Sequence, residues 1–164
     1  MASLRIAVVG APGAGKSALL AALAATVQRP LVATEAASIH ALGERMYDLV
    51  LECVDVRDVI GDVRGASPLG PSGRGGSYTG PFVCVYTKMD FTDGTMFNGD
   101  EDANMDPEEE ATVLLRNECR LEIAFNLRTG DAACVDASFT VSARTGWELD
   151  ELVRYVEHLQ PLAH

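Results

Sequence analysis

The feature that most constrains this chain is the octapeptide at residues 10–17, which reads Gly-Ala-Pro-Gly-Ala-Gly-Lys-Ser. It follows the apolar run Leu4–Val9, whose length and branched side chains are typical of a strand buried on both faces. It precedes a stretch in which leucine and valine recur at helical spacing until Pro30. A strand, a tight glycine-rich loop and a helix in this order predict a P-loop.

The residue types of this loop suit the binding of phosphate. Glycines let backbone N–H groups curl around phosphate oxygens at the start of a helix. Lys16 can reach the outer phosphates and act on them in catalysis, and the Ser17 hydroxyl can coordinate Mg²⁺. We therefore expect nucleotide binding by residues of the loop and the first helical turn: Gly10, Gly13, Ala14, Gly15, Lys16, Ser17 and Ala18.

Alternating strand and helix patterns predict the fold class. We expect a loop at 29–37, strands at 38–46, 47–56, 82–86 and 135–142, and helices from 106 to about 128 and over 149–159. Such alternation indicates an α/β sandwich around a mostly parallel sheet. The length of 164 residues is typical of a single domain, so we expect one domain over residues 1–164.

Composition argues against several classes of function. Thirteen basic and 24 acidic side chains give a net charge of −11, which repels nucleic acids and anionic membranes. No apolar run approaches the roughly 20 residues that span a bilayer, and neither a signal sequence nor a lipid-anchor motif is present. We expect a cytoplasmic, intracellular protein with no nucleic-acid partner, which protein partners recruit to any organelle or assembly.

Two segments do not fit a compact helix or strand. Residues 61–80 contain seven glycines, two prolines and three serines, a composition that predicts a mobile loop. Residues 91–106 are expected to form an acidic loop insertion before the helix that starts at Asp106 and Pro107.

Three further motifs follow the P-loop. Asp58-Val-Ile-Gly61 has the form D-x-x-G, Thr87-Lys88-Met89-Asp90 has the form N/T-K-x-D, and Ser142-Ala143-Arg144 is similar to S-A-K. Together with the P-loop, and in this order, they resemble the Ras-like small GTPases over most of the chain. The resemblance implies a P-loop NTPase three-layer sandwich, a Ras-like G domain with an altered centre, that binds GTP and GDP with Mg²⁺.

The resemblance also implies individual roles. Asp58 would act on Mg²⁺ through water, the Gly61 amide would sense the γ-phosphate, and Thr34 would cover the metal. Asp90 would select guanine, because a carboxylate can accept hydrogen bonds from N1–H and the N2 amino group, which adenine does not offer as a pair. A backbone amide of the Ser142–Arg144 element would meet the guanine oxygen.

The sequence departs from the family pattern in ways that bear on activity. Asp62 stands where the family has a water-positioning Gln, and it lacks the donor of an amide. Pro12 replaces a residue that is often Gly. We therefore expect slow GTP hydrolysis, with Asp62 as a weak catalytic candidate, and action through protein effectors or a larger complex. The glycine-rich segment would leave the usual switch helix unformed.

The centre of the sheet allows two interpretations. If 82–86 is the guanine-element strand, the family's central strand is missing, and 82–86 must pair directly with Leu4–Val9. Asp90 would then stand one strand too near the phosphates, since neighbouring strands are only about 4.8 Å apart. If 82–86 is instead the central strand, the match at 87–90 is accidental. We favour the first interpretation because its match is longer.

Two other functions remain open. The chain could be a GTPase-like structural subunit of a larger assembly with weak nucleotide switching or none. It could also be a P-loop nucleotide kinase, although it has few arginines placed for a lid or an acceptor site.

Overall fold

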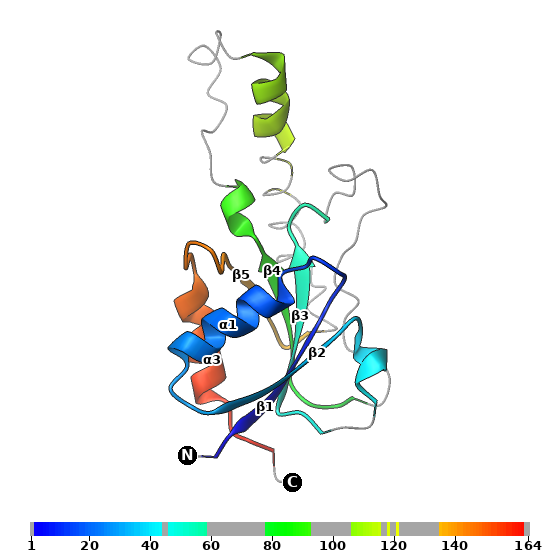
Figure 1. The fold of residues 1–164 in the computed structure, drawn as a ribbon, viewed down its shortest axis with the longest axis vertical. Coiled ribbons are helices and arrows are strands. Elements are labelled where there is room, and N and C mark those ends of the chain that lie inside the picture. The colour runs from blue at the N-terminus through cyan, green and yellow to red at the C-terminus, as the bar shows by residue number, and fades with distance from the viewer. Residues whose placement is uncertain are drawn as a thin grey trace.

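The computed structural model describes residues 2–43, 46–58, 78–92, 106–115, 118, 121 and 135–162. These residues form a five-stranded sheet with the order β2-β1-β3-β4-β5, in which all neighbouring strands are parallel (Figure 1). The strands are β1 (Leu4–Val9), β2 (Leu31–Ala36), β3 (Leu49–Asp55), β4 (Phe82–Thr87) and β5 (Ala137–Thr140). The expected α/β fold with a mostly parallel sheet is confirmed.

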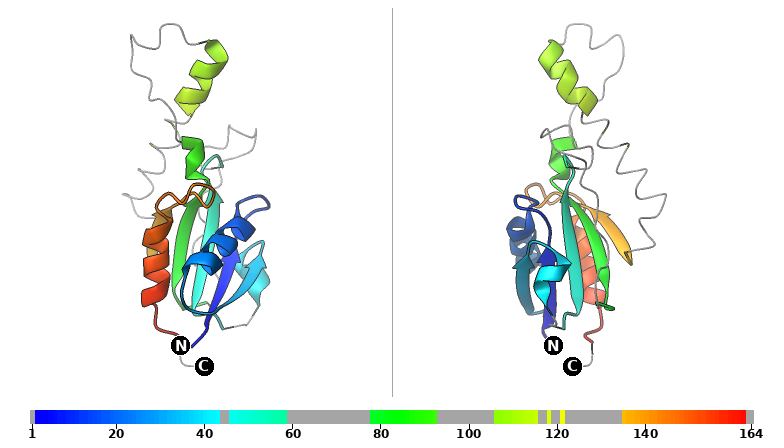
Figure 2. Two further views of the ribbon diagram at one scale, coloured as in Figure 1. Left: turned by 60° about the vertical axis from the view of Figure 1, so that its left-hand side comes forward. Right: turned by 90° about the vertical axis from the view of Figure 1, so that its right-hand side faces the viewer.

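Two helices lie on one face of the sheet (Figures 1 and 2). They are α1 (Lys16–Thr26) and α3 (Leu149–His158), and both pack against one hydrophobic cluster with the sheet. The 3-10 turn η1 (Ile39–Leu42) packs on the other face, and η3 (Met89–Thr92) closely follows β4. None of the helices in the described residues is long and apolar enough to cross a membrane.

The apolar patterns explain which strands are central. Every residue of β3 and of β4 is buried, as expected for strands covered on both faces. In β1, Ile6 and Val8 join the cluster beneath α1, whereas Ala7 and Val9 join the cluster on the η1 face. This alternation has the period of two that a strand requires, so the two faces of the sheet can be assigned from β1.

The segment between the first helix and β3 differs from the prediction. Residues 31–36 form a strand rather than a loop, and 38–46 contains η1 rather than a strand. The reason is that Ile39 and Leu42 lie three residues apart and pack together on one face of a turn. Gly43 follows with a φ of 67°, which ends the turn.

The centre of the sheet also differs from the prediction. β4 pairs with β3 along its whole length, from Val50 beside Phe82 to Asp55 beside Thr87, and β3 pairs with β1. The expectation that β4 would pair directly with β1 is therefore wrong, because β3 lies between them. The loop after β4 is two strands away from the P-loop strand, which removes the spacing objection to Asp90.

The remaining elements agree with the prediction where they are described. Residues 107–115 are helical, and the Asp106 carboxylate accepts hydrogen bonds from the backbone of Glu108 and Glu109 at 2.8 and 3.1 Å. This is the expected N-cap. The predictions for the glycine-rich loop up to residue 77, for the acidic loop from 93 to 105 and for the helix end near 128 lie outside the described residues.

Candidate functional site

The site segments gather at one edge of the sheet, beyond the carboxyl ends of the strands (Figure 1). The P-loop follows β1, and Ser142–Arg144 follow β5. Thr87 is the last residue of β4, and residues 88–90 follow it. The order of strands changes direction at β1, because β2 lies on one side of β1 and β3 lies on the other. Ligands of open α/β sheets bind outside the carboxyl ends of the strands at such a switch point.

The P-loop is a tight turn that only glycine allows at its first position. Gly10 has a φ of 152°, and a Cβ atom there would lie 2.5 Å from the Cys53 carbonyl oxygen of β3. Lys16 folds back over the loop, with its Nζ donating to the carbonyl oxygens of Gly10 and Ala11 at 2.6 and 3.0 Å. The ammonium group is therefore held at the mouth of the loop, where outer phosphates would lie.

The helix that follows the loop presents unpaired amides. Gly15 is the N-cap of α1 with a φ of 86°, and no side chain caps the helix. Within the described residues, the amides of Gly15, Lys16 and Ser17 donate to no backbone group. Free N–H groups at the positive end of a helix dipole form a site for an anion such as phosphate.

The loop after β4 is tied directly to the P-loop. The Thr87 hydroxyl is buried and donates to the Ala14 carbonyl at 2.6 Å, and Lys88 Nζ donates to the Gly13 carbonyl at 2.6 Å. Lys88 has a φ of 61°, a left-handed conformation that turns the chain sharply at the strand end. The predicted base-side residues Thr87 and Lys88 therefore lie against the predicted phosphate-side residues.

Asp90 is held by the loop that follows β5. The Ser142 hydroxyl, which is fully buried, donates to Asp90 Oδ1 at 2.9 Å, and it also accepts from the Thr145 amide at 3.2 Å. Arg144 Nη1 lies 3.8 Å from Asp90 Oδ2. The amide of Ala143 donates to no atom of the described chain. A carboxylate after β4 and an amide after β5 that donates to no described atom are thus both available at this end of the sheet.

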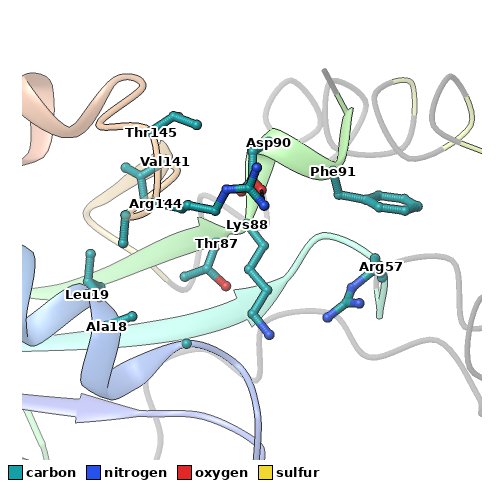
Figure 3. A pocket seen from close by; sticks show the side chains of 12 residues that line it. Ala18, Leu19, Arg57, Thr87, Lys88, Asp90, Phe91, Val141, Arg144 and Thr145 are labelled. Atoms are coloured by element: carbon teal, nitrogen blue, oxygen red, sulfur yellow. Dashed lines mark ion pairs between the residues drawn. The ribbon is translucent and has the colours of Figure 1, made fainter. Parts of the chain in front are cut away.

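Residues from α1, its N-cap and the segments that end or follow β3, β4 and β5 line a cavity of about 670 Å³ (Figure 3). Figure 3 shows Lys88 running through its middle, with Asp90 beyond one end of the side chain and Ala18 and Leu19 of α1 to one side. The lining is completed by Gly15, Arg57, Thr87, Phe91, Val141, Ala143, Arg144 and Thr145. The volume lies in the range of small-molecule sites, and apolar walls with few polar groups are typical of them.

Asp55 is a site residue that sequence reasoning missed, because it ends an apolar run and belongs to no motif. Its carboxylate is fully buried and lies 2.7 Å from Arg57 Nη2 and 3.1 Å from Lys88 Nζ. Burial alone would raise the pKa of Asp55, but hydrogen bonds from Arg57 and Lys88 outweigh burial and lower the pKa to about 2. The carboxylate therefore holds Lys88 in its place beside the P-loop.

The stability that is lost on replacing Asp55 should depend on pH in a defined way. The carboxyl has a pKa of about 2 when folded and 3.8 ordinarily, so its contribution is complete above pH 4 and is lost as pH falls towards 2. We expect Asp55→Asn to lower the free energy of unfolding by about 2 kcal/mol at pH 7. Urea denaturation at several pH values should show that the difference in unfolding free energy between the variant and the unsubstituted protein becomes smaller only below pH 4.

The exposed Asp150 on α3 provides the control for this measurement. Asp150→Asn removes the same charge from a side chain that is 75% exposed, where an ion pair contributes little. We expect its unfolding free energy to follow that of the unsubstituted protein at every pH. A gap for Asp55→Asn that persists unchanged to pH 2 would contradict the role of the ionised carboxylate.

The residues predicted for the metal side come from three different segments of the fold. The only hydrogen bond of the Ser17 side chain to the described residues is donated to Glu35 Oε2, at 3.0 Å. Thr34 lies within β2 rather than in a loop, and Asp58 lies after β3, lining a cavity of about 260 Å³ with Gly10 and Ala11. The predictions for Gly61 and Asp62 lie outside the described residues.

Comparison with known proteins identifies the fold. No family model and no curated protein matches the sequence. Translation elongation factor SelB from Methanococcus maripaludis is similar in its apo form, with a TM-score of 0.54 and 15% identity over 99% of this chain and 35% of that chain. Its complex with the GTP analogue GPPNHP gives 0.50 and 15%, over 97% of this chain and 35% of that chain.

Sup35 complexed with GMPPNP is also similar, with a TM-score of 0.50 and 17% identity over 98% of this chain and 45% of that chain. The present chain therefore spans less than half the length of these proteins. At such identities the likeness shows the fold alone. This chain therefore shares the α/β fold of these proteins.

Proposed function

We propose that this chain is a Ras-like small GTPase that binds GTP and GDP together with Mg²⁺, hydrolyses GTP slowly and acts through protein partners. The phosphates would bind at the free amides of α1 and at Lys16, and the base would bind at Asp90. SelB and Sup35 have been determined with GTP analogues, which is consistent with this use of the fold.

The observation that supports the proposal best is the position of Lys88. Its Nζ bonds the Gly13 carbonyl of the P-loop, while Asp90, two residues further on, stands at the other end of the same cavity. The intervening β3 places this loop two strands from β1. The contact of Lys88 with the P-loop and the nearby Asp90 carboxylate therefore support a site in which one nucleotide reaches both the P-loop and a carboxylate for its base.

The donor atoms beside the P-loop fit Mg²⁺. The Ser17 hydroxyl is an oxygen ligand of the kind this ion prefers, and the Glu35 carboxylate, 3.0 Å from that hydroxyl, can accept a hydrogen bond from a metal-bound water. The described residues contain no ready-made cluster of three metal ligands, so phosphate oxygens and water would supply the remaining ligands. When bound, Mg²⁺ would neutralise charge on the outer phosphates.

Slow hydrolysis is consistent with the residues beside the phosphate site. Ala37 and Ser38 line the smaller cavity together with Gly10 and Ala11. Neither has the side-chain amide that orients an attacking water in this family. The side chain of Asp62 is a carboxylate and likewise has no amide. A single-turnover GTPase rate in the range of efficient unassisted family members would contradict slow hydrolysis.

Substitution of Lys16 tests the proposed phosphate site. Lys16→Met keeps the length of the side chain but removes its charge and its donors. We expect GDP affinity, measured by calorimetric titration with Mg²⁺, to fall by at least about 100-fold, since charge-assisted hydrogen bonds to phosphate are lost. Arg154→Met removes a charge from the exposed face of α3 and should leave GDP affinity unchanged. Equal affinities for the two variants would contradict the proposal.

A further inference from the structure

We propose that Glu35, at the end of β2, is the carboxylate that holds the Mg²⁺ hydration shell beside the P-loop, in the role that the family motif assigns to Asp58. The proposal rests on the proposed nucleotide function and names the residue that serves it. It begins from one contact, in which the Ser17 hydroxyl donates to Glu35 Oε2 at 3.0 Å.

The order of the strands supports this assignment. β2 pairs with β1 in parallel, and Glu35 lies beside Val8, two residues before Gly10. Gly10 itself donates its amide to the Ala36 carbonyl at 3.3 Å. The carboxyl end of β2 thus adjoins the P-loop directly. Asp58 follows β3, which lies on the opposite side of β1.

The faces of β2 separate Glu35 from its neighbour Thr34. Val8, the partner of Glu35, packs in the cluster beneath α1, whereas Ala7, the partner of Thr34, packs in the cluster with η1. Successive side chains of a strand point to opposite faces. Glu35 therefore lies on the face that carries Ser17, and Thr34 points to the other face of the sheet.

The chemistry of the pair suits a metal site. A hydroxyl has one donor and two lone pairs, so Ser17 can donate its proton to Glu35 and still present a lone pair to a cation. The second carboxylate oxygen of Glu35 has no hydrogen-bond partner in the described chain. It is therefore available to accept a hydrogen bond from a metal-bound water, which Mg²⁺ usually retains.

The matched variants Glu35→Gln and Asp58→Asn test the assignment, since each removes one negative charge from a carboxylate. The readout is the Mn²⁺ affinity of the protein–GDP complex, measured by electron paramagnetic resonance, with Mn²⁺ as the probe for Mg²⁺. We expect Glu35→Gln to weaken Mn²⁺ binding by about 10-fold or more, as for other carboxylates around a metal's ligands. Asp58→Asn should leave Mn²⁺ affinity within about two-fold of the unsubstituted value, as expected of an independent site.

GDP binding in the presence of EDTA separates the two proposals. Glu35 is exposed on an edge strand, so its variant should fold and should bind GDP without metal as the unsubstituted protein does. If GDP binds and Glu35→Gln leaves Mn²⁺ affinity unchanged, or Asp58→Asn weakens it instead, the assignment of Glu35 is overturned while the proposed function stands. If the unsubstituted protein binds no GDP with or without metal, both proposals fail.

Discussion

Asp90→Asn should reverse the base preference of the protein. The Asp90 carboxylate accepts a hydrogen bond from Ser142 and has further lone pairs for the N1–H and N2 amino donors of guanine. An asparagine amide would turn its own N–H₂ group towards a guanine donor, whereas xanthine carries an acceptor oxygen at that position. We expect GDP affinity to fall by at least about 100-fold, because a buried donor is left unpaired, and affinity for xanthosine diphosphate to rise.

The comparison needs a control for the loss of charge alone. Asp150→Asn, on the exposed side of α3, should leave both affinities unchanged. Competition titration against a fluorescent nucleotide gives all affinities in one assay. If Asp90→Asn binds GDP as tightly as the unsubstituted protein, the base does not lie at Asp90, and the base end of the proposed site is wrong.

Gly10→Ala should be the most destabilising single change in the P-loop. A Cβ atom at this position would lie 2.5 Å from the Cys53 carbonyl oxygen, which belongs to the central strand β3 and cannot move aside without disturbing the sheet. The φ of 152° is also unfavourable for alanine. We expect the free energy of unfolding to fall by about 3 kcal/mol or more.

Gly13→Ala separates the clash from the backbone strain. Gly13 has a φ of 78°, but a Cβ atom there would meet nothing within 4 Å. We expect a loss of about 1 kcal/mol, the strain of a left-handed alanine. Urea denaturation of the two variants should therefore show a clearly larger shift for Gly10→Ala. Equal shifts would mean that the P-loop does not pack against β3 as described.

The motifs could be predicted from the sequence because each combines unusual residue types with a strand end. The glycines and Lys16 of the P-loop, Lys88 and Asp90 after β4, and Ser142 after β5 all lie within local patterns that a linear sequence displays. Their gathering at one edge of the sheet follows from the parallel strands, since the carboxyl ends of parallel strands meet there.

The parts that could not be predicted depend on contacts between distant segments. β2 is an edge strand in which Val32 is 55% exposed and the polar residues Thr34 and Glu35 interrupt the apolar ones. It therefore lacks the apolar run that marks a buried strand. The order of strands is a property of the whole sheet, and the sequence alone allowed β4 to pair with β1. Asp55 was missed because a charge within a buried strand becomes informative only when Arg57 and Lys88 are seen beside it.

The most direct test of the central claim is the ratio of the dissociation constants of the unsubstituted protein for ADP and GDP, measured with Mg²⁺ in one competition assay. A carboxylate that accepts two donors from guanine predicts tight GDP binding and ADP binding that is weaker by at least about 100-fold. Equal affinities, or no binding of either nucleotide, would contradict the account of a guanine-nucleotide site formed by the P-loop, Lys88 and Asp90.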